Sequence, residues 1–390
     1  MSKKLKVCML TPYFHPHTGG TEKYVRDLSA ELVKQGHDVT VISNNVPKEK
    51  NAPATETLDG IKVIRLKAID YIYLPSSMEF NLDMVKGFDV LHAHAPAISF
   101  VRAVRNAGIP LVVTYHCDTV MFDKVFGMPT PEWFKWGFEF VTSNYNKLWL
   151  KAADEIINTS DSYASSSPVL KQFHPNVIPI GMHCEAFDKI IAARGFNETT
   201  KKKNQILFLG RLASNKGVEY LIRALNIVVR KFPDTQLVIS GEGEEKPHLL
   251  ALIKELELEK AVKWEGNLNL EKIVDFYSNS LVYVLPSINR LEAFGIVQLE
   301  AMACRTAVIA SDIPGVNSVM NPGETGLLVP KMNPEALAEA LMKLLGNPQL
   351  AIEMGKAGRA LLEKKYSWPL IAEKVIAVYE KAIAKRAKKK

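Results

Sequence analysis

The chain has 390 residues, of which 47% are hydrophobic and 23% charged, a composition that is typical of globular proteins and excludes wholesale disorder. Its length predicts two or three domains rather than one. No apolar run approaches the roughly 18 residues that a membrane-spanning helix requires, and the first residues do not resemble a secretory signal, so we expect neither feature.

The formal net charge of +7 is concentrated at one end of the chain. Residues 381–390 carry six basic groups and no acidic one, so subtracting six from seven leaves about +1 for all other residues. This distribution argues against a nucleic-acid-binding surface on the body of the protein. The four cysteines are scattered without a CxxC pair, which favours a reducing, cytoplasmic environment; they are Cys8, Cys117, Cys184 and Cys304.

The first half of the chain alternates short apolar runs with amphipathic stretches. Tyr24, Leu28 and Leu32 recur at helical spacing after the first run, and the pattern stops at Gly36. This alternation predicts a parallel sheet with helices on both faces. The predicted strands are Lys4–Leu10, Asp38–Ser43, Val63–Leu66, Val90–His94, Leu111–His116 and Glu155–Thr159.

A second series of the same kind follows a polar segment at residues 184–204, which we interpret as a linker. Its predicted strands are Ile206–Gly210, Leu237–Gly241, Val262–Trp264, Leu281–Leu285, Ala307–Ser311 and Leu327–Val329. The sequence therefore predicts an α/β protein with two doubly wound, Rossmann-like domains, residues 1–183 and 205–367, and a final helix over 368–390.

Ligands of open parallel sheets bind where strands end and helices begin, so the residues after each strand are the candidate site. Gly19 and Gly20 precede the first helix, where the backbone can approach a phosphate, although such a pair also suits an ordinary turn. Arg211 and Lys216 follow the strand Ile206–Gly210 and are suited to hold a diphosphate; the alternative is a solvated surface loop.

The segment after the strand Leu281–Leu285 carries two carboxylates. Glu292 is expected on the loop and Glu300 inside the following helix. Carboxylates beside a phosphate site are poor phosphate ligands but good acceptors for sugar and ribose hydroxyls. The alternative is that both stabilise the start of a helix through its dipole.

Eight motifs occur in a fixed order over nearly the whole chain, and through them it resembles glycosyltransferase family 4, whose members have the GT-B architecture. They are TPYFHPHTGGTEKYVRDLSAEL, VVTYHCD, VIPIGMHCEAF, LFLGRLASNKGVEYLIRAL, VISGEGEE, VKWEGNLN, EAFGIVQLEAMA and ETGLLVP. The chain departs from the usual family pattern in having Arg305 and Ala307 for a glycine and a proline, Ile180 before Gly181, and Pro314 before Gly315. These departures bear on sugar or acceptor preference rather than on transfer itself.

The resemblance implies roles for the matched positions. Arg211 and Lys216 would clamp the donor diphosphate, Glu300 would hold the ribose hydroxyls, and Glu292 would contact the transferred sugar. His116 would face the sugar and the acceptor across an interdomain cleft, and the terminal helix would cross back onto the first domain. The remaining donor-site positions are Gly19, Gly20, Gly241, Gly266, Asn267, Leu268, Phe294, Gly295 and Ile296.

The resemblance thus implies a retaining hexosyltransferase that uses a nucleotide-diphospho-sugar of the GDP-mannose or UDP-glucose type. The acceptor would be a hydroxyl of a glycan or lipid-linked molecule in surface polysaccharide or glycolipid synthesis. No metal or other cofactor is expected, since Arg211 and Lys216 would take the metal's place, and no nucleic acid partner is expected. The expected location is the cytoplasm, with peripheral contact at the inner face of the plasma membrane.

Three other functions are alternatives to the one that the resemblance implies. His92, His94, His116 and Asp118 lie at two neighbouring strand ends, a set that suits zinc in a metal-dependent hydrolase. A sugar-nucleotide epimerase on the same architecture would bind the same donor without an acceptor. A dinucleotide oxidoreductase is disfavoured, because the GxGxxG pattern begun at Gly241 has Lys246 in its third glycine position.

Residues 119–150 contain nine of the 33 aromatic residues. Trp133, Trp136 and Trp149 are interspersed with Lys124, Lys135 and Lys147, a mixture that suits a membrane headgroup layer or lipid acceptor. The alternative is ordinary helix packing in which lysines extend along the core. Together with the basic tail, this stretch leads us to expect contact with an anionic membrane; the alternative for the tail is a frayed, solvated terminus.

Overall fold

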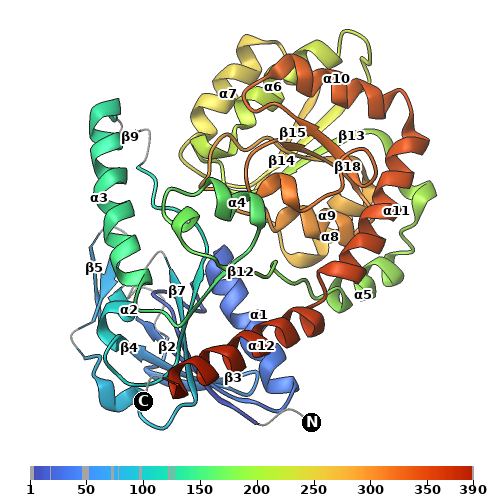
Figure 1. Cartoon of the computed structure of the whole chain (residues 1–390). Coiled ribbons are helices and arrows are strands. Elements are labelled where there is room, and N and C mark those ends of the chain that lie inside the picture. Colours follow the sequence, from blue (N-terminus) through green and yellow to red (C-terminus); the bar gives the residue numbers. More distant parts are fainter. Residues whose placement is uncertain are drawn as a thin grey trace. The chain divides into compact units, whose positions relative to one another are not determined.

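The computed structural model describes residues 4–17, 19–45, 52–71, 74–77, 79–95, 99–121, 124–125 and 128–388. It divides into two compact units. The first consists of Met1–Gly181 together with Trp368–Lys390, and the second is Met182–Ser367 (Figure 1). Each unit is an α/β layer structure built on a largely parallel sheet, so the predicted fold class is confirmed.

The sheet of the first unit has eight strands in the order β12-β11-β8-β7-β1-β2-β4-β3. All neighbours are parallel except β3 and β4, which pair antiparallel. The strands are β1 (Lys6–Leu10), β2 (Asp38–Asn44), β3 (Thr55–Leu58), β4 (Ile61–Leu66), β7 (Val90–Ala95), β8 (Leu111–Tyr115), β11 (Glu155–Asn158) and β12 (Asn176–Val177). Two small hairpins, β5 (Ile69–Tyr71) with β6 (Leu74–Ser76) and β9 (Lys124–Val125) with β10 (Met128–Pro129), lie outside this sheet.

Five α-helices belong to the described part of the first unit: α1 (Gly20–Lys34), α2 (Ser99–Val104), α3 (Glu132–Leu150), α4 (Asp161–Ser166) and α12 (Trp368–Ala387). Helix α1 buries Tyr24, Leu28 and Leu32 on one side, and its C-cap residue, Gln35, is followed by Gly36, whose φ of 92° is left-handed. Helix α12 lies beside α1 and covers the sheet with a fully buried stripe that includes Trp368. The last helix of the chain therefore completes the core of the unit that the first residues begin.

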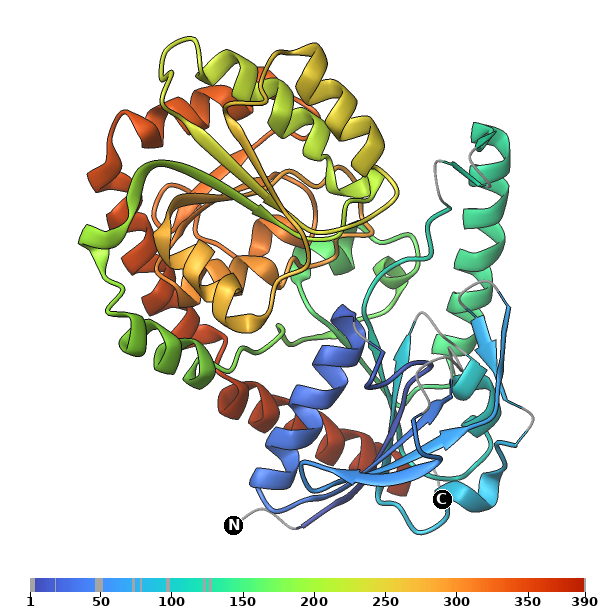
Figure 2. The ribbon, with the colours of Figure 1, turned by 180° about the vertical axis from the view of Figure 1, so that it is seen from behind.

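The sheet of the second unit has six parallel strands in the order β15-β14-β13-β16-β17-β18. They are β13 (Lys202–Leu209), β14 (Gln236–Ser240), β15 (Val262–Glu265), β16 (Ser280–Leu285), β17 (Ala307–Ser311) and β18 (Gly326–Val329). Seven helices in the described residues surround it (Figure 2): α5 (Glu185–Arg194), α6 (Val218–Val228), α7 (Lys246–Glu255), α8 (Leu270–Asn279), α9 (Val297–Ala303), α10 (Pro334–Leu345) and α11 (Pro348–Lys365). One apolar cluster joins α6, α7, α10 and α11 to these strands.

The predicted linker at residues 184–204 is a folded part of the second unit, so this expectation is corrected. It forms α5, which buries Phe187 and Ile191, and Arg359 of α11 binds both oxygens of Asp188 at 2.7 and 2.9 Å. Lys201 is buried, and its ammonium donates to the Ser280 carbonyl and the Thr306 hydroxyl. The polar composition favoured a linker, although one of its lysines is buried and bonds to carbonyl and hydroxyl oxygens.

Each sheet reverses its direction of strand addition at one point. In the first unit the chain adds β2 and β4 on one side of β1 and β7 and β8 on the other. In the second unit it adds β14 and β15 on one side of β13 and β16 and β17 on the other. Crevices of doubly wound sheets form at the carboxyl ends of the strands at such a reversal. The neighbours β1 and β7, and β13 and β16, therefore mark the candidate site of each unit.

A glycine at the end of the first half supports the packing of α12. A Cβ atom added at Gly181 would lie 2.5 Å from the ring of Trp368, which is fully buried. We expect Gly181→Ala to destabilise the first unit by about 1–3 kcal/mol, because the ring has no room to move. Thermal unfolding followed by near-UV circular dichroism would measure this loss.

The matched control for Gly181→Ala is Gly137→Ala. An added Cβ at Gly137, within α3, meets nothing within 4 Å, and alanine favours a helix interior over glycine by about 1 kcal/mol. The same chemical change should therefore leave the protein as stable or more so. Equal losses for the two variants would contradict the packing described for Trp368.

Candidate functional site

The reversal point of the second sheet brings together three of the predicted site residues. Arg211 and Lys216 follow β13, with Lys216 at the end of a short 3-10 turn, Ser214–Lys216. Glu292 lies on the loop after the adjacent strand β16. Lys216 and Glu292, on loops that the sequence indicated separately, thus meet at the carboxyl edge of two paired strands, and Arg211 follows β13 at the same edge.

Close backbone packing holds these two loops against each other. Gly217 has a φ of 64°, and a Cβ there would lie 2.2 Å from the Pro286 carbonyl oxygen. The Ile288 amide donates to the Asn215 carbonyl at 2.9 Å. Any larger residue at 217 would push the loops apart, because the clash is with backbone. The positions of Lys216 and Glu292 are therefore set by main-chain geometry.

The electrostatic centre of this site is an ion pair between the Lys216 ammonium and the Glu292 carboxylate. Ser287 donates its hydroxyl to the same Glu292 oxygen at 3.2 Å. Both side chains of the ion pair are largely shielded, with exposed fractions of 19% and 12%. Arg211 is exposed and pairs with no carboxylate among the described residues. The site therefore presents one free guanidinium beside a cation that an incoming anion would draw away from its carboxylate.

Glu300 lies inside α9, as the sequence indicated, and its carboxylate accepts from the Tyr277 hydroxyl at 3.4 Å. Tyr277 is fully buried, and burial raises its pKa well above the usual value, so it stays a hydrogen-bond donor. Ahead of the helix, Phe294 is buried against Tyr366, and Gly295 has a φ of 78°. Ile296 is the N-cap residue of α9.

Two other glycine positions lie at carboxyl ends of neighbouring strands. Gly241 follows β14 with a φ of 139°, and a Cβ there would lie 1.9 Å from the Gly210 carbonyl oxygen. Gly266 follows β15, and its carbonyl accepts from the Ser240 hydroxyl at 2.8 Å. Asn267 is exposed and Leu268 half-buried in the loop before α8. These backbone positions lie along the same sheet edge as Arg211.

In the first unit, the glycines at the start of α1 have an unexpected neighbour. Gly19 is the N-cap residue and Gly20 the first residue of α1. A Cβ at Gly19 would lie 2.3 Å from a carboxylate oxygen of Glu22, and the other oxygen pairs with His17 at 3.2 Å. An anion approaching these glycines would therefore meet the Glu22 carboxylate in this conformation. Sequence reasoning missed Glu22 because a glutamate in a first helical turn is ordinary.

The three histidines near the reversal point of the first sheet form a buried group. His92 bonds through its two ring nitrogens to the Tyr379 and Thr114 hydroxyls, each at 2.7 Å. His94 Nδ1 lies 3.2 Å from His116 Nε2. The edge of the Tyr24 ring packs against His94 and His116. His116, directly after β8, is thus oriented by His94, and Tyr379 connects the network to α12.

The hydrogen bonds of this group leave little for a metal. Both nitrogens of His92 are occupied, and the Asp118 carboxylate accepts from the Ser167 hydroxyl at 2.6 Å and from the Tyr115 hydroxyl at 3.2 Å. Among the described residues, no three His, Cys, Asp or Glu side chains are grouped as metal ligands. Nothing in this arrangement supports a metal-dependent hydrolase.

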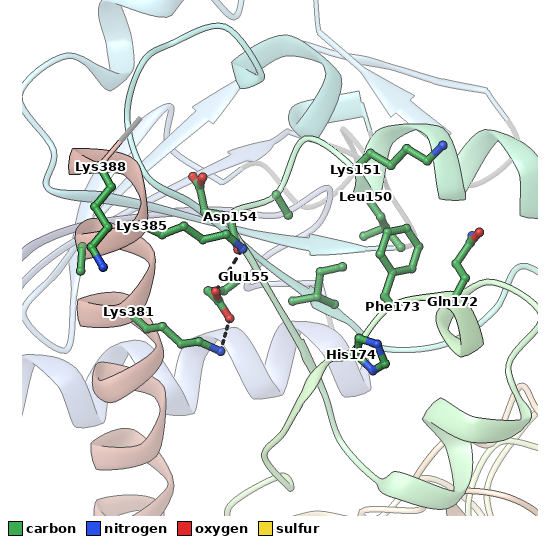
Figure 3. A pocket seen from close by; sticks show the side chains of 13 residues that line it. Leu150, Lys151, Asp154, Glu155, Gln172, Phe173, His174, Lys381, Lys385 and Lys388 are labelled. Atoms are coloured by element: carbon green, nitrogen blue, oxygen red, sulfur yellow. Dashed lines mark hydrogen bonds and ion pairs between the residues drawn. The ribbon is translucent and has the colours of Figure 1, made fainter. Parts of the chain in front are cut away.

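The basic C-terminal segment is largely tied down rather than frayed. Lys381 and Lys385 contact Glu155 at 2.8 and 3.3 Å, and Arg386 contacts Asp154 at 2.9 Å. Lys381 and Lys385, with Asp154 and Glu155, line an open hollow of about 800 Å³ between α12 and the end of α3 (Figure 3). The hollow lies at the amino end of β11, opposite the edge where ligands of parallel sheets bind, so we do not assign the reaction to it.

Helix α3 carries most of the predicted aromatic stretch, and Trp133 and Trp136 are exposed while Trp149 is half-buried. Lys135 pairs with Glu132 of the same helix. Lys124 lies outside the residues whose side chains the structure describes. No helix in the described ranges combines the length and the apolar character needed to cross a bilayer.

Acidification should destabilise the first unit through its buried histidines. Burial lowers the pKa of His92 to about 3, with a smaller effect from His116, and lowers the pKa of His116 to about 4. An unfolded histidine titrates near 6.5. Between these pH values the unfolded state binds more protons than the folded state. The free energy of unfolding is therefore unaffected by these histidines above about pH 6.5 and falls as the pH decreases below it.

We therefore expect the melting temperature of the protein to drop between pH 7.5 and 5. The melting temperature of His92→Gln should drop less steeply over this range, even if this variant is less stable at pH 7.5. Differential scanning calorimetry over this range would measure both slopes. His248→Gln, which alters an exposed histidine of the second unit, is the control and should follow the unmodified protein. A His92→Gln slope equal to that of the control would rule out this source of acid sensitivity.

Comparisons with known proteins agree with this architecture. Residues 18–184 match the family model "Glycosyltransferase Family 4", and residues 190–361 match "Glycosyl transferases group 1". The phosphatidyl-myo-inositol mannosyltransferase of Mycobacterium tuberculosis is 29% identical over 98% of this chain and 99% of its own length.

Two solved structures extend the likeness to the whole fold. The sucrose-phosphate synthase of Thermosynechococcus elongatus superposes with a TM-score of 0.77 at 25% identity, covering 98% of this chain and 100% of the other. Anabaena HepE in complex with UDP-glucose gives a TM-score of 0.73 at 18% identity, covering 96% and 99%. With its two parallel-sheet units and these matches across both, the chain belongs to glycosyltransferase family 4, has the GT-B fold and is a glycosyltransferase.

Proposed function

We propose that the protein transfers a hexose from a nucleotide-diphospho-sugar to a hydroxyl of a glycan or lipid-linked acceptor, with retention of the anomeric configuration. The observation that carries this proposal is the pairing of Lys216 with Glu292 beside the free Arg211 at the reversal point of the second sheet. Two cations and a carboxylate at one strand edge match the two halves of such a donor, an anionic diphosphate and a sugar rich in hydroxyl groups.

Donor binding exchanges partners within this group. The diphosphate replaces the Glu292 carboxylate at the Lys216 ammonium, and Arg211 adds a planar, two-pronged contact. The released Glu292 carboxylate then accepts hydrogen bonds from sugar hydroxyls, with Ser287 fixing one of its oxygens. Glu300, oriented by Tyr277, accepts from the ribose hydroxyls. The remaining donor-site positions, from Gly241 to Ile296, supply backbone contacts.

In the reaction, the bond between the anomeric carbon and the diphosphate oxygen breaks, and a bond from that carbon to the acceptor oxygen forms on the same face. The acceptor hydroxyl loses its proton to the departing phosphate oxygen. Arg211 and Lys216 stabilise the negative charge that develops on the leaving group, which is where preorganised charge contributes most. No carboxylate needs to act as a nucleophile, unlike in retaining glycosidases.

We assign acceptor handling to the first unit, where His116 follows β8. Since burial lowers its pKa to about 4, His116 is neutral at physiological pH and can accept or donate one hydrogen bond to a hydroxyl. His94 occupies His116 Nε2, which leaves Nδ1 for the acceptor or the sugar.

The identity of the donor and acceptor rests on the relatives. The M. tuberculosis relative is named as a mannosyltransferase that acts on phosphatidyl-myo-inositol, which favours GDP-mannose as the donor and a lipid-linked acceptor. UDP-glucose is the second donor to test. We place the reaction in the synthesis of a glycolipid or surface polysaccharide.

The donor should reveal itself by stabilising the folded protein. A thermal-shift panel of UDP, GDP, ADP and their common sugars is expected to give one responsive base, because a ligand at a hundredfold excess over its Kd adds about 2.7 kcal/mol. In Glu292→Ala the nucleotide diphosphate should still bind, since Lys216 is freed, whereas the additional shift from the sugar should disappear.

Glu339→Ala, on an exposed face of α10, is the control for Glu292→Ala and should respond like the unmodified protein. Absence of any shift with all three bases would contradict the donor site. Loss of the nucleotide shift itself in Glu292→Ala would contradict the exchange of partners at Lys216.

Removing either cation should slow transfer more than it weakens folding. We expect Arg211→Ala and Lys216→Ala each to lower kcat/KM by about a hundredfold to a thousandfold, by analogy with the loss of one preorganised donor to a developing anion. Steady-state assays with the responsive sugar nucleotide would measure this. The control is Arg223→Ala, which removes an exposed arginine on α6 and should leave kcat/KM unchanged. If Arg211→Ala and Lys216→Ala both had the same kcat/KM as this control, the proposed mechanism would be refuted.

A further inference from the structure

Helix α3 leaves one whole face to solvent. Trp133 and Trp136 have exposed fractions of 75% and 70%, and Phe140, Val141 and Leu148 are each more than half exposed. Only Asn146 and Leu150 of this helix are fully buried. Other large apolar residues that are exposed in the described structure, such as Leu250 and Met332, are isolated. Contiguous apolar surface of this kind marks a binding face.

The exposed residues share one side of the helix. Trp133, Trp136 and Phe140 repeat at intervals of three and four residues, and Leu148 continues the same side at its C-terminal end. Asn146 and Leu150, near the C-terminal end of the helix, are buried against the rest of the first unit. Helix α3 thus has the distribution of an amphipathic helix whose apolar face is exposed rather than packed into a core.

The unpaired charge on this face is positive. Lys147 and Lys151 flank Leu148 at the C-terminal end of the helix. Of the two acidic residues of α3, Glu132 is exposed but pairs with Lys135 of the same helix, and Glu139 is half-buried and lies toward the packed side by helical spacing. No ion pair joins Lys147 or Lys151 to any described residue. Lys151 also lines the hollow that Lys388 enters from α12 (Figure 3).

This charge distribution identifies the partner. A second copy of the chain docked on the same face would bring two more unpaired lysines, whereas its exposed carboxylate, Glu132, already pairs with Lys135. Anionic lipid headgroups supply that charge, tryptophan prefers the headgroup layer, and the aliphatic and phenyl side chains reach the acyl boundary. The mixture of Trp, Phe, Leu and Lys on one solvent-exposed face matches an interfacial helix better than a protein interface.

We propose that the outer face of α3, with Trp133 and Trp136 inserted and Lys147 and Lys151 at the headgroups, docks the protein on an anionic lipid bilayer. The inference rests on the proposed function in one respect, because docking would bring the first unit to a lipid-linked acceptor. The docking itself requires neither donor nor acceptor.

The test is sedimentation of the full chain with vesicles, without any sugar nucleotide. Vesicles of phosphatidylcholine containing about a third phosphatidylglycerol should bind the protein, and pure phosphatidylcholine vesicles should bind it far more weakly. Trp133→Ser/Trp136→Ser and Lys147→Glu/Lys151→Glu should each lower the partition coefficient by about tenfold or more, since each lysine near such a surface contributes about a fivefold factor. Trp133, Trp136 and Lys151 are exposed and Lys147 is half-buried, and far-UV circular dichroism would check the folding of both double variants.

Two matched controls lie in the second unit, Leu250→Ser for the apolar change and Lys272→Glu for the charge reversal; both positions are exposed. Their partition coefficients should equal that of the unmodified protein. Absence of binding to the anionic vesicles would overturn the proposal. So would partition coefficients of both α3 double variants equal to that of the unmodified protein. So would a dimer, measured by light scattering, that dissociates in Trp133→Ser/Trp136→Ser. Because the assay contains no donor, an error in the proposed reaction would leave these outcomes unchanged.

Discussion

The ion pair between Lys216 and Glu292 is the interaction on which the proposed chemistry depends. The Lys216 side chain is only 19% exposed, so its ammonium loses part of its hydration, and the carboxylate compensates for that loss while the site is empty. The same pairing keeps both groups in place, so a diphosphate meets a cation that is already oriented. The constraint that makes this possible is backbone packing at Gly217, where no side chain fits beneath the Pro286 carbonyl.

Most of the fold could be predicted because the strands have a simple composition. All twelve predicted strands are present within a few residues of their expected bounds, since buried parallel strands consist of short apolar runs between turn residues. The short strands β3, β5, β6, β9, β10 and β12 were not predicted, because two to four residues leave too little periodicity to detect. The segment 184–204 was misjudged because Lys201 looks solvated in sequence and is buried in fact.

For the candidate site, the sequence indicated the charged residues but not what orients them. Arg211, Lys216 and Glu292 stand out because charge at a strand end is informative. Ser287, which bonds Glu292, and Tyr277, which bonds Glu300, have no such signal, since a serine and a tyrosine near a strand are common in any core. In the same way His116 was a candidate, whereas its connection through His94 and His92 to Tyr379 joins residues up to 287 positions apart and required the structure.

The hydrogen bond between Tyr379 and His92 has a consequence for synthesis of the chain. Residues 1–181 emerge first from the ribosome, yet they lack the helix that covers their sheet and the hydroxyl that satisfies His92. Synthesis of the first unit therefore starts before that of the second. Its core can be completed only after the whole second unit has been made, because α12 is translated last. During that interval its sheet remains partly uncovered, which is the state in which exposed apolar strands recruit chaperones or aggregate.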